Sequence, residues 1–231
     1  MFKRSLVAAV VTILAMFIRV ASADALLLTP GASALPDAFT TSPSTGVIAS
    51  NAGSWATTPT VPAKATGSFT SAVKTAQSGE TPNLTGCLTC LIFLYSVTNN
   101  ATSVDSIVRV VLQGFTGFIV DVGYSLLSPL GSVVPTSDDR SANGSVIGYN
   151  FSPPPLGVGV LGPGQTTVFL EIMTNATSYA LAPALRINNS ESTPLLSVYV
   201  PTVSEPGTLL LLASGLTGLG LLAHRRMRGA A

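Results

Sequence analysis

The sequence has 231 residues, of which 9% are charged, and its formal net charge is +1. Six of the eleven Lys and Arg side chains lie near the two ends, so residues 24–204 carry five basic and nine acidic side chains, a net charge of −4. A sparse, mildly acidic surface excludes nucleic acid as a partner, because binding to the phosphate backbone requires a basic patch. A segment of this length can form one domain with a sizeable core.

The N-terminal segment, residues 1–23, has the three parts of a secretory signal peptide. A basic pair near its start is followed by the apolar run Leu6–Ile18 and by the sequence Ala21-Ser22-Ala23. Signal peptidase requires small side chains at the first and third positions before the cut, which Ala23 and Ala21 provide. The sequence therefore predicts export through the Sec translocon and cleavage after Ala23 by signal peptidase, with an uncut signal anchor as the alternative.

Residues 24–68 are rich in Ser, Thr, Ala, Pro and Gly and contain few large apolar side chains. This composition predicts either a flexible leader or irregular edge strands with long turns. Trp55 is the only tryptophan of the chain. We expect its indole to anchor this segment to a hydrophobic core, and an exposed platform for stacking sugar rings is the alternative.

Residues 69–201 form the predicted main domain, in which short apolar and β-branched runs alternate with Gly, Pro and Asn turns. No strong 3.6-residue apolar period favours helix, and Glu, Lys and Arg are scarce. We therefore expect an all-β domain, namely an antiparallel β-sandwich of Ig-like or jelly-roll-like architecture, with a closed barrel as the alternative. The predicted strands cover Gly67–Thr75, Cys90–Thr98, Ser106–Leu112, Gly117–Tyr124, Val146–Phe151, Thr166–Thr174, Leu185–Asn188 and Leu195–Val200.

Cys87 and Cys90, separated by two residues, are the only cysteines of the chain. A strand rather than a helix is expected after Cys90, so the helix N-terminus that activates a thioredoxin-like thiol is missing from the prediction. Two cysteines with no neighbouring histidine do not complete a structural zinc site. In an exported protein the pair predicts a local disulfide that fixes the turn before the next strand, with free thiols or redox activity as the alternatives.

The only histidine, His224, lies near the C-terminus, outside the main domain. The domain therefore lacks His-based nucleophile systems and His-based metal sites. Its acidic run Asp138-Asp139 is expected in a polar loop, where the carboxylates are solvated or paired with Arg140. A weak calcium site and a catalytic carboxylate pair are the alternatives. We predict a non-enzymatic domain without a metal or cofactor.

The C-terminal segment, residues 203–228, combines a short motif, an apolar stretch and a basic cluster. In order, these are Ser204-Glu205-Pro206, Thr208–Ala223, and Arg225, Arg226 and Arg228. The 16 apolar residues would form a helix of about 24 Å, a little short of a hydrocarbon core of about 30 Å. The basic cluster predicts a stop-transfer signal that stays on the cytoplasmic side. We therefore expect a transmembrane helix in contact with membrane lipid.

This order of features resembles the PEP-CTERM sorting signal of Gram-negative bacteria. Glu205 and Pro206 match the motif, whereas Ser204 stands where the family has its first Pro. The resemblance implies that an exosortase, a membrane-embedded cysteine transpeptidase, cuts near the motif. It also implies a precursor anchored in the inner membrane, from which the body reaches the cell surface or the extracellular polysaccharide matrix. A plain membrane anchor is the alternative.

The main domain resembles, more loosely, the β-rich ectodomains that carry such tails. The shared features are a strand ending Val97-Thr98-Asn99, the run Val120–Tyr124, and the run Pro163–Thr166 before a strand. This resemblance implies a fold and no assigned activity. A structural or matrix protein of the envelope is therefore the first hypothesis, and a membrane-tethered module that binds a glycan or a surface partner is the second.

Overall fold

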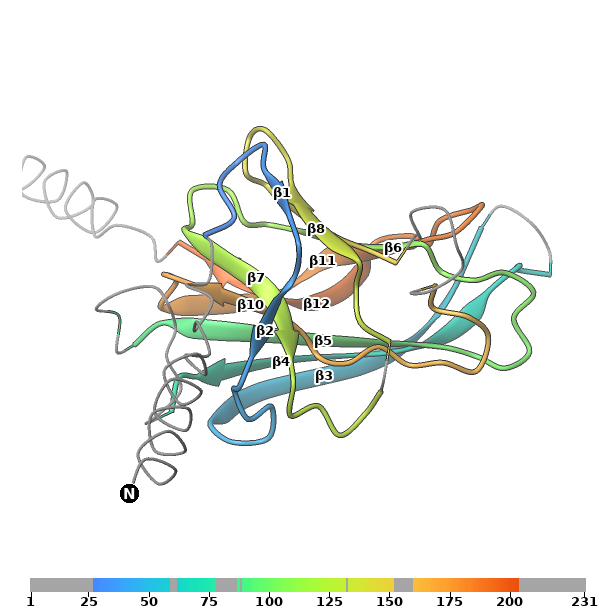
Figure 1. Cartoon of the computed structure of the whole chain (residues 1–231), viewed down its shortest axis with the longest axis horizontal. Helices are drawn as coiled ribbons and strands as arrows, with labels where there is room; N and C mark the ends of the chain where they lie inside the picture. Colours follow the sequence, from blue (N-terminus) through green and yellow to red (C-terminus); the bar gives the residue numbers. More distant parts are fainter. Residues whose placement is uncertain are drawn as a thin grey trace, which may run out of the picture.

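The computed structural model describes residues 27–58, 62–77, 87, 89–131, 133–151 and 160–203. These residues contain twelve β-strands and no helix, and the strands form two six-stranded sheets (Figure 1). The predicted all-β class is confirmed, and the two sheets are consistent with a β-sandwich. Within the described ranges no helix is long and apolar enough to cross a membrane. The predicted signal helix and transmembrane helix fall outside these ranges.

The chain passes repeatedly between the two sheets. Sheet A consists, in spatial order, of β1 (Ser33–Ala34), β8 (Ser137–Arg140), β9 (Val146–Asn150), β6 (Arg109–Gln113), β11 (Ser178–Asn188) and β12 (Leu196–Thr202). Sheet B consists of β2 (Asp37–Phe39), β7 (Val120–Ser125), β10 (Leu170–Thr174), β5 (Leu91–Asn99), β4 (Thr66–Thr75) and β3 (Val47–Ala56). Neighbouring strands are antiparallel except β2 and β7, which run parallel.

Strand β5 lies inside sheet B, and its side chains are buried on both faces. The core between the sheets takes its alternate residues, Leu91, Phe93, Tyr95 and Val97. Ile92 and Leu94 point to the other face, because neighbouring side chains alternate along a strand, and there they pack with Phe39 and Met173. The continuous apolar run of this strand therefore reflects burial on two faces rather than one.

Two tyrosine hydroxyl groups join the sheets across the core. Tyr95 of β5 donates a hydrogen bond to the Tyr199 carbonyl of β12, with the two oxygens 2.6 Å apart. Tyr149 of β9 donates to the Glu171 carbonyl of β10 at 2.9 Å. Each hydroxyl finds its acceptor on the facing sheet, so the polar end of a large buried side chain is satisfied. Burial raises the pKa of both hydroxyls, and both therefore stay protonated donors.

Trp55 packs into the core near the end of edge strand β3. Its side chain is buried, and its indole Nε1 donates to the Ser68 carbonyl at 3.1 Å. A Cβ on Gly67, the partner of Trp55 across β3 and β4, would lie 2.5 Å from the indole ring. The absence of a side chain on Gly67 therefore leaves the room that the indole ring occupies. This confirms the expectation that Trp55 anchors the segment rather than forming a surface platform.

Four strands lie outside the eight predicted for the main domain. β1, β2 and β3 lie within residues 24–68, where the structure shows the edge strands that were one of the two alternatives for this segment. β8 coincides with the run expected as a polar loop. β1, β2 and β3 are edge strands, and β8 is next to an edge. An edge strand needs fewer apolar side chains, so its sequence carries a weak strand pattern.

We expect the substitution Gly67→Ala to lower the free energy of unfolding by about 1–3 kcal/mol, because the added methyl group would overlap the Trp55 ring and the Thr98 carbonyl. Thermal unfolding followed by the fluorescence of Trp55 measures this effect. The control is Ser68→Ala at the neighbouring exposed position, which keeps the carbonyl that accepts from the indole. Equal melting temperatures for Gly67→Ala and Ser68→Ala would contradict this packing.

Candidate functional site

One end of the sandwich brings together the first described residues and the end of β12, the last described strand (Figure 1). The Leu28 amide donates to the Val120 carbonyl at 3.1 Å, which ties the N-terminal segment to β7. The Ser178 hydroxyl donates to the Thr202 carbonyl at 2.6 Å, which ties β11 to the end of β12. We call this region the tail end of the sandwich; it comprises residues 27–30, 117–120, 143–144, 174–178 and 202–203.

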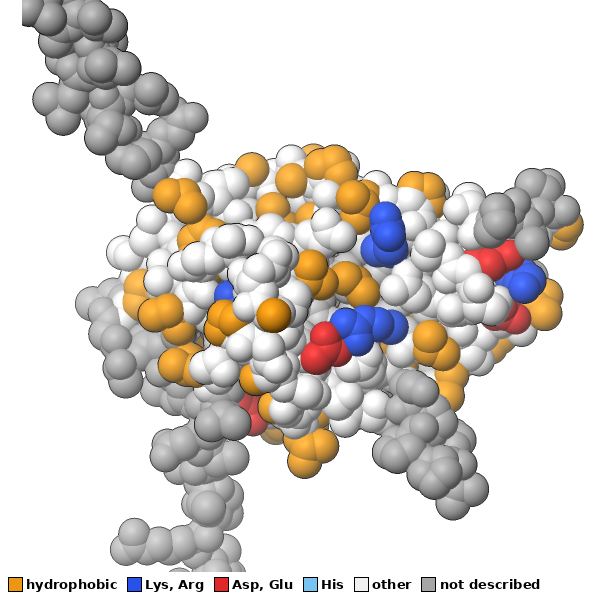
Figure 2. Space-filling view, turned by 90° about the horizontal axis from the view of Figure 1, so that it is seen from above, with side chains coloured by type: hydrophobic (Ala, Val, Ile, Leu, Met, Phe, Trp, Pro, Cys, Tyr) orange, Lys and Arg blue, Asp and Glu red, His pale blue; other side chains and the backbone are white. Residues whose placement is uncertain are grey.

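The tail end contains an apolar pocket of about 410 Å³. Its wall is formed by residues 27–30, 117–120, Arg140, Asn143 and Gly144. Figure 2 shows hydrophobic side chains at this end, at the left of the molecule, whereas most charged side chains in that view lie further along the sandwich. The volume is within the range of small-molecule sites, and the wall suits an apolar ligand better than a polar one.

The buried guanidinium of Arg140 holds the wall of this pocket together. Its Nη1 donates to the Leu28 carbonyl at 3.0 Å, and its Nη2 donates to the Phe115 and Phe118 carbonyls at 3.0 and 2.8 Å. Its Nε donates to the Gly144 carbonyl at 3.1 Å. Burial lowers the pKa of Arg140, but an arginine side chain stays charged in proteins. One side chain therefore connects the N-terminal segment, the β6–β7 connection and the β8–β9 turn.

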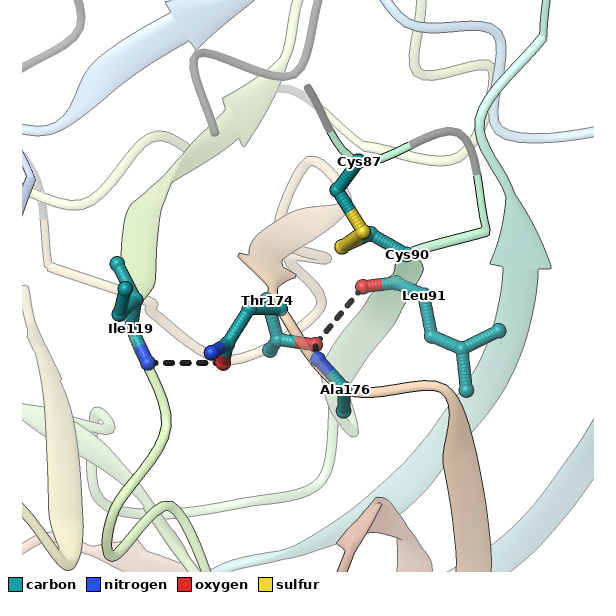
Figure 3. Close-up of a disulfide and its surroundings, with 7 residues drawn as sticks. Cys87, Cys90, Leu91, Ile119, Thr174 and Ala176 are labelled. Carbon is teal, nitrogen blue, oxygen red and sulfur yellow. Dashed lines mark hydrogen bonds between the residues drawn. A yellow bond between two sulfur atoms is a disulfide. The ribbon is translucent and has the colours of Figure 1, made fainter. Parts of the chain in front are cut away.

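Cys87 and Cys90 lie close together and are joined by a disulfide, with their Cα atoms 5.4 Å apart (Figure 3). This arrangement fits the predicted pairing. The residue after Cys90 is held by the β10–β11 connection: the Leu91 amide donates to the Ala176 carbonyl at 3.0 Å, and the Thr174 hydroxyl donates to the Leu91 carbonyl at 3.0 Å. The disulfide thus closes the entry to β5 beside the tail end.

Asp138 and Asp139 do not form the solvated loop that the sequence predicted. Both lie on β8, and alternation along the strand sends them to opposite faces. Asp139 forms a two-point ion pair with Arg109, at 2.5 and 2.6 Å, rather than with Arg140. Burial opposes ionisation of Asp139, but hydrogen bonds from Arg109 and Asn150 hold its pKa below the usual value. The expected pairing with Arg140 was therefore wrong.

Asp138 is 1% exposed and lies beside Tyr149, a residue of the core between the sheets. Neither of its carboxylate oxygens has a hydrogen-bond partner among the described residues. Burial, followed by the charge of Asp37, raises the pKa of Asp138 to about 8. The same two causes raise the pKa of Asp121 to about 7. Within the described ranges, no three His, Cys, Asp or Glu side chains are arranged to hold a metal ion.

The residues predicted for the two export signals lie outside the described ranges. They are Ala21, Ala23, Ser204, Glu205, Pro206, Arg225, Arg226 and Arg228. The pocket and the bonds of Arg140 were not predicted, because backbone carbonyl acceptors leave no pattern in the sequence.

Comparisons with protein-family models, with curated proteins and with solved structures found no match for this chain.

We expect Arg140→Lys to lower the melting temperature by roughly 5–10 °C. A lysine ammonium cannot reach carbonyls on all sides as the guanidinium does, and each buried carbonyl left unpaired costs about 1–3 kcal/mol. Thermal unfolding followed by circular dichroism measures the change. The matched control is Arg186→Lys on β11, for which the described residues provide no hydrogen-bond partner at Nε. Similar melting temperatures for the two variants would contradict the role assigned to Arg140.

We expect the stability of the wild-type protein to fall as the pH rises through about 8. The folded protein keeps Asp138 protonated up to that pH, whereas an unfolded Asp ionises near pH 3.8. The stability from this group is therefore fully present below the unfolded pKa and is lost as the pH rises through the folded pKa. Asp138→Asn has no proton to lose, so its melting temperature should decline less between about pH 5 and 9.

The neighbouring substitution Asp139→Asn is the control for this pH series. The pKa of Asp139 is lowered in the folded protein, so its stabilising effect is present above the unfolded pKa and is lost only as the pH falls through the folded one. Asp139→Asn should therefore lower the melting temperature at every pH of the series, because it weakens the pair with Arg109. Parallel pH profiles for the wild type and Asp138→Asn would refute the buried, protonated state of Asp138.

Proposed function

We propose that this protein is a non-enzymatic envelope protein of a Gram-negative bacterium, sorted by an exosortase-type transpeptidase to the cell surface or the extracellular polysaccharide matrix. The observation that carries the proposal is where the sandwich ends. β12 ends at Thr202, so a single residue, Val203, separates it from Ser204. A cut at the Ser204-Glu205-Pro206 motif would leave every described strand on the released side. The folded body would therefore survive processing unchanged.

The N-terminal side supports the same proposal. The first described strand, β1, begins at Ser33, nine residues after the predicted cut between Ala23 and Asp24. In the proposed route the Sec translocon exports the chain and signal peptidase removes residues 1–23. The stretch Thr208–Ala223 then spans the inner membrane in contact with lipid, and Arg225, Arg226 and Arg228 stay in the cytoplasm. The Ig-like or jelly-roll-like sandwich is thus flanked by a signal helix and a transmembrane helix in the precursor.

The absence of an enzymatic role is part of the proposal. The sequence between the two signals contains no histidine. The adjacent carboxylates of Asp138 and Asp139, which were the candidate acid pair, point to opposite faces of sheet A. Trp55, which was the candidate platform for a sugar ring, is buried. These observations favour a structural role over the alternative of a tethered glycan-binding module.

The test is the C-terminal peptide of the mature protein, identified by mass spectrometry in the envelope and medium of the native host. We expect an end between Ser204 and Gly207 in the wild type, and an intact tail retained in membranes for Glu205→Ala. Ser204→Pro restores the first Pro of the family motif and should increase the processed fraction. Val104→Ala, which shortens an exposed apolar side chain away from the motif, is the control and should be processed like the wild type. A wild-type chain found only with its full tail would reduce the motif to a membrane anchor.

A further inference from the structure

The tail end of the sandwich has an exposed apolar face. Leu27 is 40% exposed, Ile119 is 49% exposed and Val203 is 70% exposed. Leu27 and Ile119 belong to the wall of the pocket, and hydrogen bonds through the β10–β11 connection link that wall to the end of β12. We call Leu27, Phe118, Ile119 and Val203, together with the pocket that the first three of them line, the apolar face. Its position beside the exit of the C-terminal tail limits what can cover it.

Chain length places this face close to the membrane when the tail is inserted. From Val203 to Thr208, where the apolar stretch begins, there are five residue steps. A fully extended chain spans at most about 3.6 Å per residue, so these two residues are at most about 18 Å apart. The headgroup layer on one side of a bilayer is about 5–8 Å thick. With the tail inserted, Val203 therefore lies at most about 10–13 Å beyond the headgroup layer, so the tail end is the part of the sandwich that can reach the bilayer surface.

The chemistry of the pocket wall suits a hydrocarbon chain. Leu27, Leu28, Phe118, Ile119 and Val120 supply apolar side chains, and the wall contains no carboxylate. Its one charged group, the guanidinium of Arg140, is already bonded to four carbonyl oxygens. An apolar ligand in the pocket therefore leaves this charge paired, because its acceptors come from the protein itself. An anionic headgroup beside the pocket would meet no negative side chain of the wall.

We propose that the apolar face docks on the periplasmic surface of the inner membrane in the tethered precursor, with an acyl chain of a membrane lipid in the pocket. This inference rests on the proposed function, in which the tail spans that membrane. A lipid chain fits better than a second copy of the protein, because the short tether holds the face at the bilayer. In this orientation the tail end faces the membrane and the opposite end of the sandwich points away from it. Docking would then hold the Ser204-Glu205-Pro206 motif at the depth of the headgroups.

The test places a fluorescent reporter on the apolar face of the full chain. Ile119→Trp is compared with the wild type after reconstitution in phosphatidylcholine vesicles with brominated acyl chains, which quench a nearby indole. The native Trp55 lies near the opposite end of the sandwich and supplies the baseline. Val104→Trp is the matched control, because Val104 is 82% exposed in the connection that follows β5 at that opposite end. Vesicle flotation and the melting temperature establish that each variant is inserted and folded.

Docking predicts at least twofold quenching of the added indole in Ile119→Trp and none beyond the baseline in Val104→Trp. Equal quenching of the two variants, in chains that float with the vesicles, would overturn docking and leave the membrane-spanning tail intact. A blue-shifted emission of Ile119→Trp that depends on protein concentration and not on bromine would assign the face to a second copy, and would also overturn the proposal. Chains that fail to float would overturn both the docking and the membrane tether of the proposed function.

Discussion

The tail end depends on the hydrogen bonds that the Arg140 guanidinium donates to four backbone carbonyl oxygens; we call this group of bonds the Arg140 clasp. Three segments without regular structure, the N-terminal residues, the β6–β7 connection and the β8–β9 turn, meet at this one guanidinium. Leu28 and Phe115 anchor two of these segments in the core, and Arg140 bonds the same two segments to the β8–β9 turn. A rigid fork with five donors can satisfy acceptors that approach from several directions, which neither lysine nor a neutral side chain can do. The hydrogen bonds of Arg140 thus join the segments that line the apolar pocket.

Away from Arg140, several polar and charged side chains lie in the interior or connect strands. Arg109 and Asp139 join β6 to β8 across the intervening β9, with Asn150 completing the group. Tyr95 and Tyr149 place hydroxyl groups at the facing sheet. Asp138 and Asp121 are exceptions, because both are buried and their carboxylate oxygens have no hydrogen-bond partner among the described residues. A buried carboxyl group without a cation is tolerated in its protonated form, so the sandwich carries a site that is weakened by alkaline conditions.

The sequence predicted what depends on apolar patterning and missed what depends on backbone geometry. The run from Leu91 to Tyr95 is apolar without interruption, and it lies in β5, a strand of sheet B that is buried on both faces. Asp138-Asp139-Arg140 looked like a polar loop, because three charged residues in a row suggest solvent. In the structure these residues lie on β8, where side chains alternate between the two faces. Asp138 is buried in the core, Asp139 pairs with Arg109, and Arg140 donates to backbone carbonyls. Neither the clasp nor the pocket that it frames could be predicted, because its acceptors are peptide oxygens that every residue carries.

The first and last described residues lie at one end of the sandwich, so a separate set of loops forms the opposite end. The connection after β5, with Val104, and the loop around Ser190, whose hydroxyl binds Asp105, lie at the far end of the long strands. In the proposed route the molecule is attached through residues beyond Val203, so those loops face away from the attachment by the full length of the sandwich. Changes in their length and sequence would then leave the proposed anchoring and processing undisturbed. Divergence between related proteins of this architecture should therefore concentrate in these distal loops.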